Sequence, residues 1–213
     1  MNKEQIIIVC LSILVSIALI VAIIYFFIIP LFKKKFMYKN FKYVYYKKVY
    51  KVAEYNDYLL INQINLKDND DIIVSKIDHI ILGKKFIYII KDRYYRGALN
   101  GEKLDNTWLF FDEKNNKKEV SNPMLKNEER VKKFCAISNI DPSFCISIVL
   151  INDDCVVKNP NELNSNNSFI ISCKKLNKLI KTIEKRKVKD IDQKSAEIAM
   201  HDLYRIYGRG QEE

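Results

Sequence analysis

Apolar residues fill the beginning of the chain without interruption. From Ile6 to Phe32 there are 27 residues with no charged side chain. A helix of that length spans roughly 40 Å, whereas the hydrocarbon core of a bilayer is about 30 Å thick. A cleaved signal peptide would have a shorter apolar stretch ending in small residues, but this stretch ends in Tyr25, Phe26 and Phe27, shortly before Pro30. The pattern therefore predicts one transmembrane helix.

Further along the chain, short apolar runs alternate with amphipathic segments. Asn122 is a suitable helix cap and Pro123 fits the first helical turn. The glycine turn at residues 83–85 joins two apolar runs and predicts a β-hairpin. The strands we expect are 72–74, 77–82, 86–90, 107–111, 145–151 and 169–173, with a polar turn at 112–118. The helices we expect are 49–60, 123–138, 174–185 and 192–207. This order predicts an α/β fold with a mixed central sheet flanked by helices.

The positive charge of the chain is concentrated beside the apolar segment. The formal net charge is +10, and residues 33–51 hold eight lysines and no acidic residue. Removing these eight leaves +2 for the rest of the chain. Lysines mixed with aromatic residues next to a span favour anionic lipid headgroups over nucleic acid as the partner of this segment. The membrane-surface lysines we expect are Lys33, Lys34, Lys35, Lys39 and Lys42.

The charge distribution also predicts the topology and the domain limits. Because positive residues follow the span, the positive-inside rule places the downstream part in the cytosol of a single-pass cell-membrane protein. We expect a short extracytoplasmic N-terminus (1–5), the span (6–32), a basic aromatic segment (33–51), an α/β domain (52–185) and a C-terminal helix with tail (186–213).

The sequence contains few other chemical signatures. None of its five cysteines forms a CxxC pair, and only two histidines are available, so a metal-binding Cys/His cluster is not expected. No P-loop, dinucleotide glycine pattern or Ser-His-Asp set is present. These absences argue against NTPases, oxidoreductases and serine hydrolases.

One ordered set of residues resembles a known family. Residues 77–97 read IDHIILGKKFIYIIKDRYYRG, and Gly101, Trp108 and an NPMLKN segment at 122–127 follow. This order resembles the nuclease-related domain family, NERD, of the restriction-endonuclease-like PD-(D/E)xK group. The resemblance implies a structural role for Gly97, Gly101, Trp108, Asn122, Pro123 and Asn127. From the residues themselves, Trp108 is expected in the core and the two glycines in turns.

The resemblance also shows where the catalytic pattern is lost. In the family, an acid and the Glu of Glu-x-Lys hold a divalent metal. Here Asp78 stands at the first acid, but Lys91 stands at the Glu position and Arg93 at the Lys position. A cation there repels a metal ion by several kcal/mol, at about 4 Å and an effective dielectric of about 20. Asp78 is expected to pair with Lys91 or Arg93 across the hairpin.

Three functional hypotheses follow. The first is a catalytically degenerate, membrane-anchored domain without a cofactor, which binds DNA, RNA or another polyanion, or serves as an interaction module. Its candidate phosphate-binding residues are Lys91, Arg93, Arg96 and Lys126, for which a solvated basic face is the alternative interpretation. The second is an active Mg²⁺- or Mn²⁺-dependent nuclease that uses Asp78, Asp92 and Glu102. Neighbours on a strand point to opposite faces, so Asp92 is expected to face away from Lys91 and Arg93 unless a local bulge re-aims it. The third is a membrane-organising protein without a nucleic-acid role.

Overall fold

The computed structural model describes residues 3–67, 70 and 72–208, without the side chains of residues 3–10, 33 and 34. The chain divides into two compact units, Met1–Val44 and Tyr45–Glu213, and each is described by itself.

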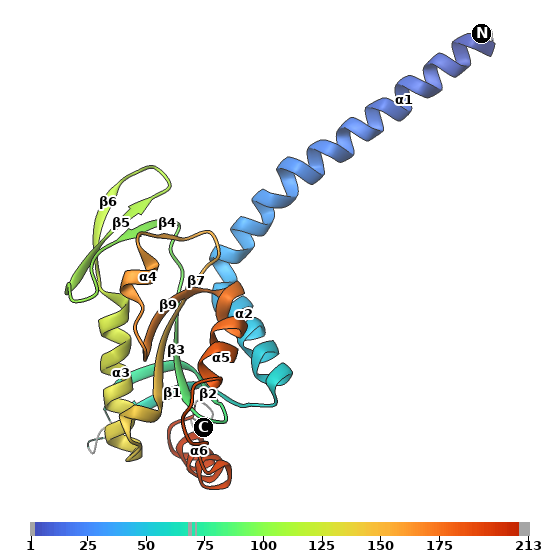
Figure 1. Cartoon of the computed structure of the whole chain (residues 1–213). Coiled ribbons are helices and arrows are strands. Elements are labelled where there is room, and N and C mark those ends of the chain that lie inside the picture. Colours follow the sequence, from blue (N-terminus) through green and yellow to red (C-terminus); the bar gives the residue numbers. More distant parts are fainter. Residues whose placement is uncertain (1–2, 68–69, 71, 209–213) are drawn as a thin grey trace. The chain divides into compact units, whose positions relative to one another are not determined.

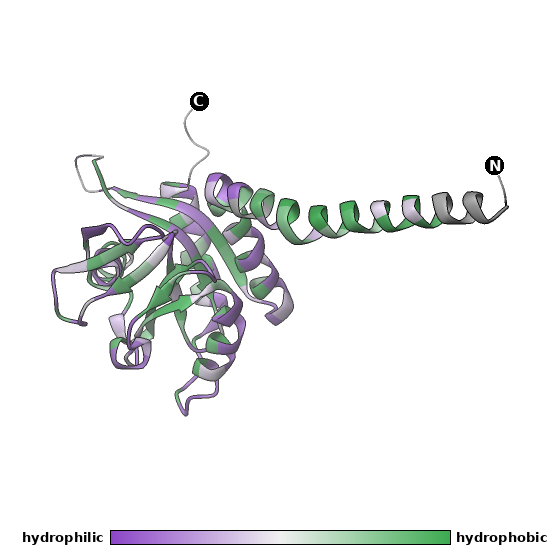
Figure 2. Cartoon of the chain, turned by 90° about the horizontal axis from the view of Figure 1, so that it is seen from above, coloured by the Kyte–Doolittle hydropathy of each residue, from purple (hydrophilic) through white to green (hydrophobic). Residues whose placement is uncertain are grey.

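The first unit is helical. It contains α1 (Lys3–Ile23), a π-helical turn (Ile24–Ile28) and the beginning of α2 (Ile29–Asn56). Leu11–Phe32 is long and apolar enough to cross a membrane, a test that a signal sequence also passes. Figure 2 shows this apolar stretch along the helix. The side chains of Lys33 and Lys34 lie outside the described residues, whereas those of Lys35, Lys39 and Lys42 are exposed.

The second unit contains a five-stranded mixed sheet in the order β1-β2-β3-β7-β9. The first three strands are antiparallel, and β7 and β9 run parallel to β3. Their bounds are β1 Leu59–Lys67, β2 Ile73–Leu82, β3 Ile87–Arg93, β7 Cys145–Ile151 and β9 Ser168–Ser172. The parallel pairing requires a crossover between β3 and β7. This crossover contains α3 and three strands of the smaller sheet, whereas the fourth strand of that sheet follows β7 (Figure 1).

The smaller sheet has the order β6-β5-β4-β8. Its bounds are β4 Gly97–Asn100, β5 Thr107–Asp112, β6 Lys117–Ser121 and β8 Val156–Val157. Trp108 is 1% exposed in its core, as expected, and the indole Nε1 donates to the Glu102 carbonyl at 2.8 Å. A Cβ on Gly101 would lie 2.2 Å from the indole ring. This glycine therefore allows the tryptophan to pack against the backbone.

Helices cover both faces of the main sheet. Helix α3 (Pro123–Ser138) packs on β7, β2 and β3, and α6 (Gln193–Tyr207) packs on β1; both contribute to one apolar cluster. The part of α2 within the second unit and α5 (Leu176–Glu184) lie on the opposite face (Figure 1). The remaining helical segments are α4 (Pro160–Leu163) and two 3-10 turns, Pro142–Phe144 and Cys173–Lys175. The predicted mixed α/β fold with flanking helices is confirmed.

Several predicted boundaries were wrong. The predicted helix 49–60 ends at Asn56, and Leu59 and Leu60 already belong to β1. Asp57 has a positive φ of 55°, which breaks the helix in a way that its apolar spacing did not reveal. The expected strands 72–74 and 77–82 form one strand, β2. The apolar pattern divided it in two because its outer half is less buried and more polar.

The polar segments were also partly misassigned. Lys117 and Lys118, placed in a turn, begin β6, an exposed strand in which alternation with apolar residues is weak. Gly97 begins β4 instead of lying in a turn. Its φ of +148° and the Phe111 carbonyl, 1.9 Å from where a Cβ would lie, leave room only for glycine. The predicted helix 174–185 begins as a 3-10 turn and becomes α-helical at Leu176.

The amide side chains before and within α3 attach this helix to the sheets. The Asn122 Oδ1 accepts from the backbone N–H groups of Met124 and Leu125, which confirms the predicted cap, and Pro123 is the first helical residue. The buried Asn127 Nδ2 contacts the Ile89 carbonyl at 3.0 Å, the Ile148 carbonyl at 3.2 Å and the Ser147 Oγ at 2.9 Å. One amide group thus holds α3 against both β3 and β7.

We predict that Asn127→Ala lowers the free energy of unfolding by about 2–3 kcal/mol, because it removes these bonds and leaves buried carbonyls without their donor. Urea unfolding followed by circular dichroism measures the change. Lys132→Ala, at an exposed position of the same helix, is the control and should change the stability by less than about 0.5 kcal/mol. Equal stability of the two variants would contradict the role of the amide.

Candidate functional site

The centre of the candidate site is an ion pair between β2 and β3. The Lys91 Nζ lies 2.9 Å from the Asp78 Oδ2, with 12% and 15% of the two side chains exposed. The ammonium also donates to the Lys76 carbonyl at 3.3 Å. The same Asp78 oxygen accepts the backbone N–H of Asp92 at 3.0 Å. Asp78 therefore pairs with Lys91, one of the two partners expected from the sequence.

Asp92 points to the opposite face of the sheet. Its Oδ2 lies 3.0 Å from the His79 Nε2, and both side chains are at most 5% exposed. The His79 Nδ1 lies 2.6 Å from the Asn62 Oδ1. Burial raises the pKa of the Asp92 carboxyl, whereas its hydrogen bond with His79 opposes that rise. Strand alternation thus separates Asp92 from Lys91 and Arg93, as the sequence predicted.

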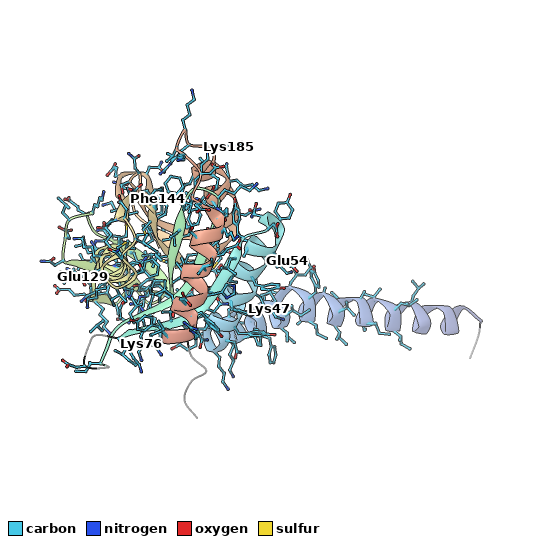
Figure 3. All side chains as sticks on the ribbon, turned by 90° about the horizontal axis from the view of Figure 1, so that it is seen from below. Lys47, Glu54, Lys76, Glu129, Phe144 and Lys185 are labelled. Carbon is cyan, nitrogen blue, oxygen red and sulfur yellow. The ribbon has the colours of Figure 1, made fainter. Side chains whose placement is uncertain are left out.

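A groove of about 410 Å³ lies on the Asp78 face, between the two strands and α3. We call it the basic groove. Its charged lining consists of Lys76, Lys91, Arg93, Lys126, Arg130 and Lys133, with Glu129 as the acidic member. Lys76 and Glu129 mark the two elements that border it in Figure 3.

The cations in the basic groove raise each other's electrostatic energy. Burial lowers the pKa of Lys91; Asp78 opposes this, while Arg130 and Arg93 lower the pKa further. Burial also lowers the pKa of Arg130, and the neighbouring Arg93 adds to the effect. The positive charge is thus less favourable at both residues than on an exposed, isolated side chain. A phosphate entering the groove would relieve the same repulsion.

These residues do not fit the divalent metal that the family resemblance implies. The Lys91 ammonium occupies the neighbourhood of Asp78 where a second carboxylate would be needed. The relocated set is not assembled either, because Asp92 faces His79 and Glu102 lines a different pocket with Lys158 and Asn159. Within the described residues, no three His, Cys, Asp or Glu side chains are placed to hold a metal ion.

The other predicted site residues are distributed as follows. Lys126 lies in the basic groove with Lys91 and Arg93. Arg96 does not line that groove, and its guanidinium pairs with Glu113. Tyr45, which was not among the predicted site residues, is buried and donates to the Arg93 carbonyl at 3.1 Å. Burial raises the pKa of this tyrosine.

The sequence analysis did not identify three cations of the groove, Lys76, Arg130 and Lys133. It also missed the buried pair of His79 and Asp92 on the opposite face. Lys126, Arg130 and Lys133 follow an i, i+4, i+7 spacing, which places them on one helical face and would have grouped them. Lys76 has no comparable signal. His79 was considered only as a zinc ligand. Its position between Ile77 and Ile81 on one strand face indicated burial.

The second unit is thus a mixed α/β fold with Asp78 on β2 and a Lys-x-Arg, Lys91 and Arg93, on β3. The family model for the nuclease-related domain, NERD, matches residues 43–152. This is just over half of the chain, and the chain belongs to the NERD family. No curated protein and no solved structure matches the chain.

We predict that Lys91→Glu creates a divalent-cation site, because it replaces the ammonium beside Asp78 with a second carboxylate. Mn²⁺ at millimolar concentration should raise the melting temperature of this variant and leave that of the parent protein unchanged. Lys133→Glu is the matched control: it adds the same charge to the groove, but its lysine donates to the Val74 carbonyl instead of pairing with Asp78. An equal Mn²⁺ shift in the parent protein would contradict the prediction.

Proposed function

We propose that this protein is a membrane-anchored NERD module that binds nucleic-acid phosphates in its basic groove without cutting them. The observation that carries the proposal is the set of cations that β2, β3 and α3 gather around the Asp78–Lys91 pair. Arg93 and Arg130 supply planar guanidinium groups, which suit the paired oxygens of a phosphate. Lys126 and Lys133 add exposed charge at the rim of the same groove.

The absence of cleavage in this proposal follows from the Lys91 ammonium. Phosphodiester hydrolysis in this family requires oxygen ligands around a metal ion, and Asp78 is committed to Lys91 instead. Binding by fixed cations requires no metal. Chelation by EDTA should therefore leave the affinity of the groove unchanged.

The anchor and its orientation are part of the same proposal. Leu11–Phe32 would cross the cell membrane once, and the lysines that follow would hold the second unit on the cytosolic side. Exposed Phe36, Tyr38 and Tyr43 alternate with exposed Lys35, Lys39 and Lys42 on α2. Such a segment suits the headgroup region of an anionic leaflet.

We predict that the full chain, in nanodiscs of neutral lipid, binds fluorescein-labelled 20-nucleotide DNA and RNA with a steep salt dependence. Fluorescence anisotropy measures the affinity, and the slope of log K against log salt counts the phosphates neutralised. Arg130→Ala should reduce that slope by about 1.

Arg96→Ala is the control for this experiment, because Arg96 lies outside the basic groove. It should leave both the affinity and the slope unchanged. No cleavage is expected with Mg²⁺ or Mn²⁺. Absence of binding at physiological salt would overturn the proposal, and cleavage that disappears in Asp78→Ala would favour an active nuclease.

We predict that a peptide of residues 33–51 binds vesicles containing phosphatidylserine. Each lysine near an anionic surface contributes roughly 1 kcal/mol. Glutamine at positions 33, 34, 35, 39 and 42 should therefore weaken binding by at least about a hundredfold, measured by vesicle co-sedimentation. Vesicles of phosphatidylcholine alone are the control. Equal binding of the peptide to both vesicle types would rule out the electrostatic contact.

A further inference from the structure

Two cysteines from successive elements lie in contact beneath α3. Cys135 is near the end of α3 and Cys145 is the first residue of β7, directly after Phe144 (labelled in Figure 3). Their Sγ atoms are 3.4 Å apart and share a hydrogen bond. Both thiols are free and buried, at 4% and 2% exposure. The pair lies in the apolar cluster that joins α3 to the sheet.

Little movement separates this arrangement from a disulfide bond. An S–S bond is about 2.05 Å long, so the two sulfur atoms must approach by about 1.4 Å. The connection between α3 and β7 starts with a left-handed residue, Asn139, and Asp141 to Ser143 are exposed. A short exposed connection can adjust without disturbing the core, which allows this approach.

The two thiols differ in the direction in which their surroundings shift the pKa. The hydrogen bond with Cys145 lowers the pKa of Cys135, although burial and Asp141 oppose the effect. The pKa of Cys145 is raised by the same hydrogen bond and by burial. Cys135 thus has the lower pKa of the two thiols. By contrast, burial raises the pKa of Cys155 and of Cys173 to about 12.

We propose that Cys135 and Cys145 are a modification site at which hydrogen peroxide, or another small hydroperoxide, forms a reversible intramolecular disulfide. The Cys135 thiolate attacks a peroxide oxygen, the O–O bond breaks, and the released hydroxide takes up a proton to leave as water. The Cys145 sulfur then attacks the resulting sulfenic acid. The S–S bond forms, the S–O bond breaks, and the second water leaves with the Cys145 proton. Two thiols lose two electrons, and the peroxide gains them.

The bond would join the end of α3 directly to β7. Helix α3 carries Lys126, Arg130 and Lys133, so the oxidised pair would hold one wall of the basic groove to the central sheet. A crosslink also restricts the unfolded chain. We expect the oxidised protein to melt about 5 °C higher than the reduced one. This inference does not depend on whether the groove binds nucleic acid.

The test is to treat the reduced full chain, in neutral nanodiscs, with a small excess of hydrogen peroxide. The expected product is 2 Da lighter and has two fewer thiols open to alkylation after denaturation. Trypsin leaves Cys135, Cys145 and Cys155 in one peptide, because no lysine or arginine lies between residues 134 and 157. Digestion before Asp141 and Asp153 separates all three, so the linked peptides identify the pair.

Cys135→Ser should abolish both the mass loss and the rise in melting temperature, and Cys155→Ser should retain both. Dithiothreitol should restore the reduced mass of the parent protein. A crosslink that involves Cys155 or Cys173, or oxidation to sulfinic acid without a crosslink, would overturn the proposal. The peptide map of the unsubstituted chain gives this result even if Cys135→Ser fails to fold.

Discussion

Strand β3 is the element on which both faces of the second unit depend. It is paired on both sides, antiparallel to β2 and parallel to β7, so its backbone groups are used within the sheet. Its side chains then have only two directions available. Lys91 and Arg93 point to the α3 face, and Asp92 points to His79 on the other face. A shift of β3 by one residue relative to β2 and β7 would exchange the side chains on the two faces. Lys91 and Arg93 would then be buried without partners.

The Lys91–Asp78 pair gives the α3 face its chemical character. The pair neutralises the charge of Asp78, and it leaves Arg93, Arg130 and the groove lysines in excess over acidic neighbours. Desolvation of Lys91 and Arg130 lowers their pKa values and makes the surplus charge costly. An oxyanion reduces that cost, whereas a metal cation increases it. The groove therefore combines a surplus of positive charge with an ion pair that occupies Asp78.

The opposite face shows a different use of charged groups. Asp92, His79 and Asn62 form a buried chain of polar contacts between β3, β2 and β1. Removing one member would leave a buried polar atom without its partner, so the network fixes the alignment of these strands. Its position away from the groove suits a structural role. The two faces of one sheet thus carry a basic groove and a buried polar network, although their residues alternate along the same strands.

The sequence by itself determined the apolar span, the mixed sheet with flanking helices, the family pattern and the loss of its Glu-x-Lys. These features depend on local periodicity, on residue order and on side-chain type, all of which are present in the linear chain. It also predicted the Asn122 cap, the Trp108 core and the separation of Asp92 from Lys91. Only the tertiary structure decided which cations share a surface. Arg96 and Arg93 are three residues apart, yet Arg96 pairs with Glu113 across the smaller sheet, while Arg130 of α3 reaches Arg93. The packing of α3 on the sheet, in which Asn127 bonds to β3 and β7, accompanies the approach of Arg130 to Arg93 and of Cys135 to Cys145. The spacing of these residues in the sequence does not reveal which of them meet.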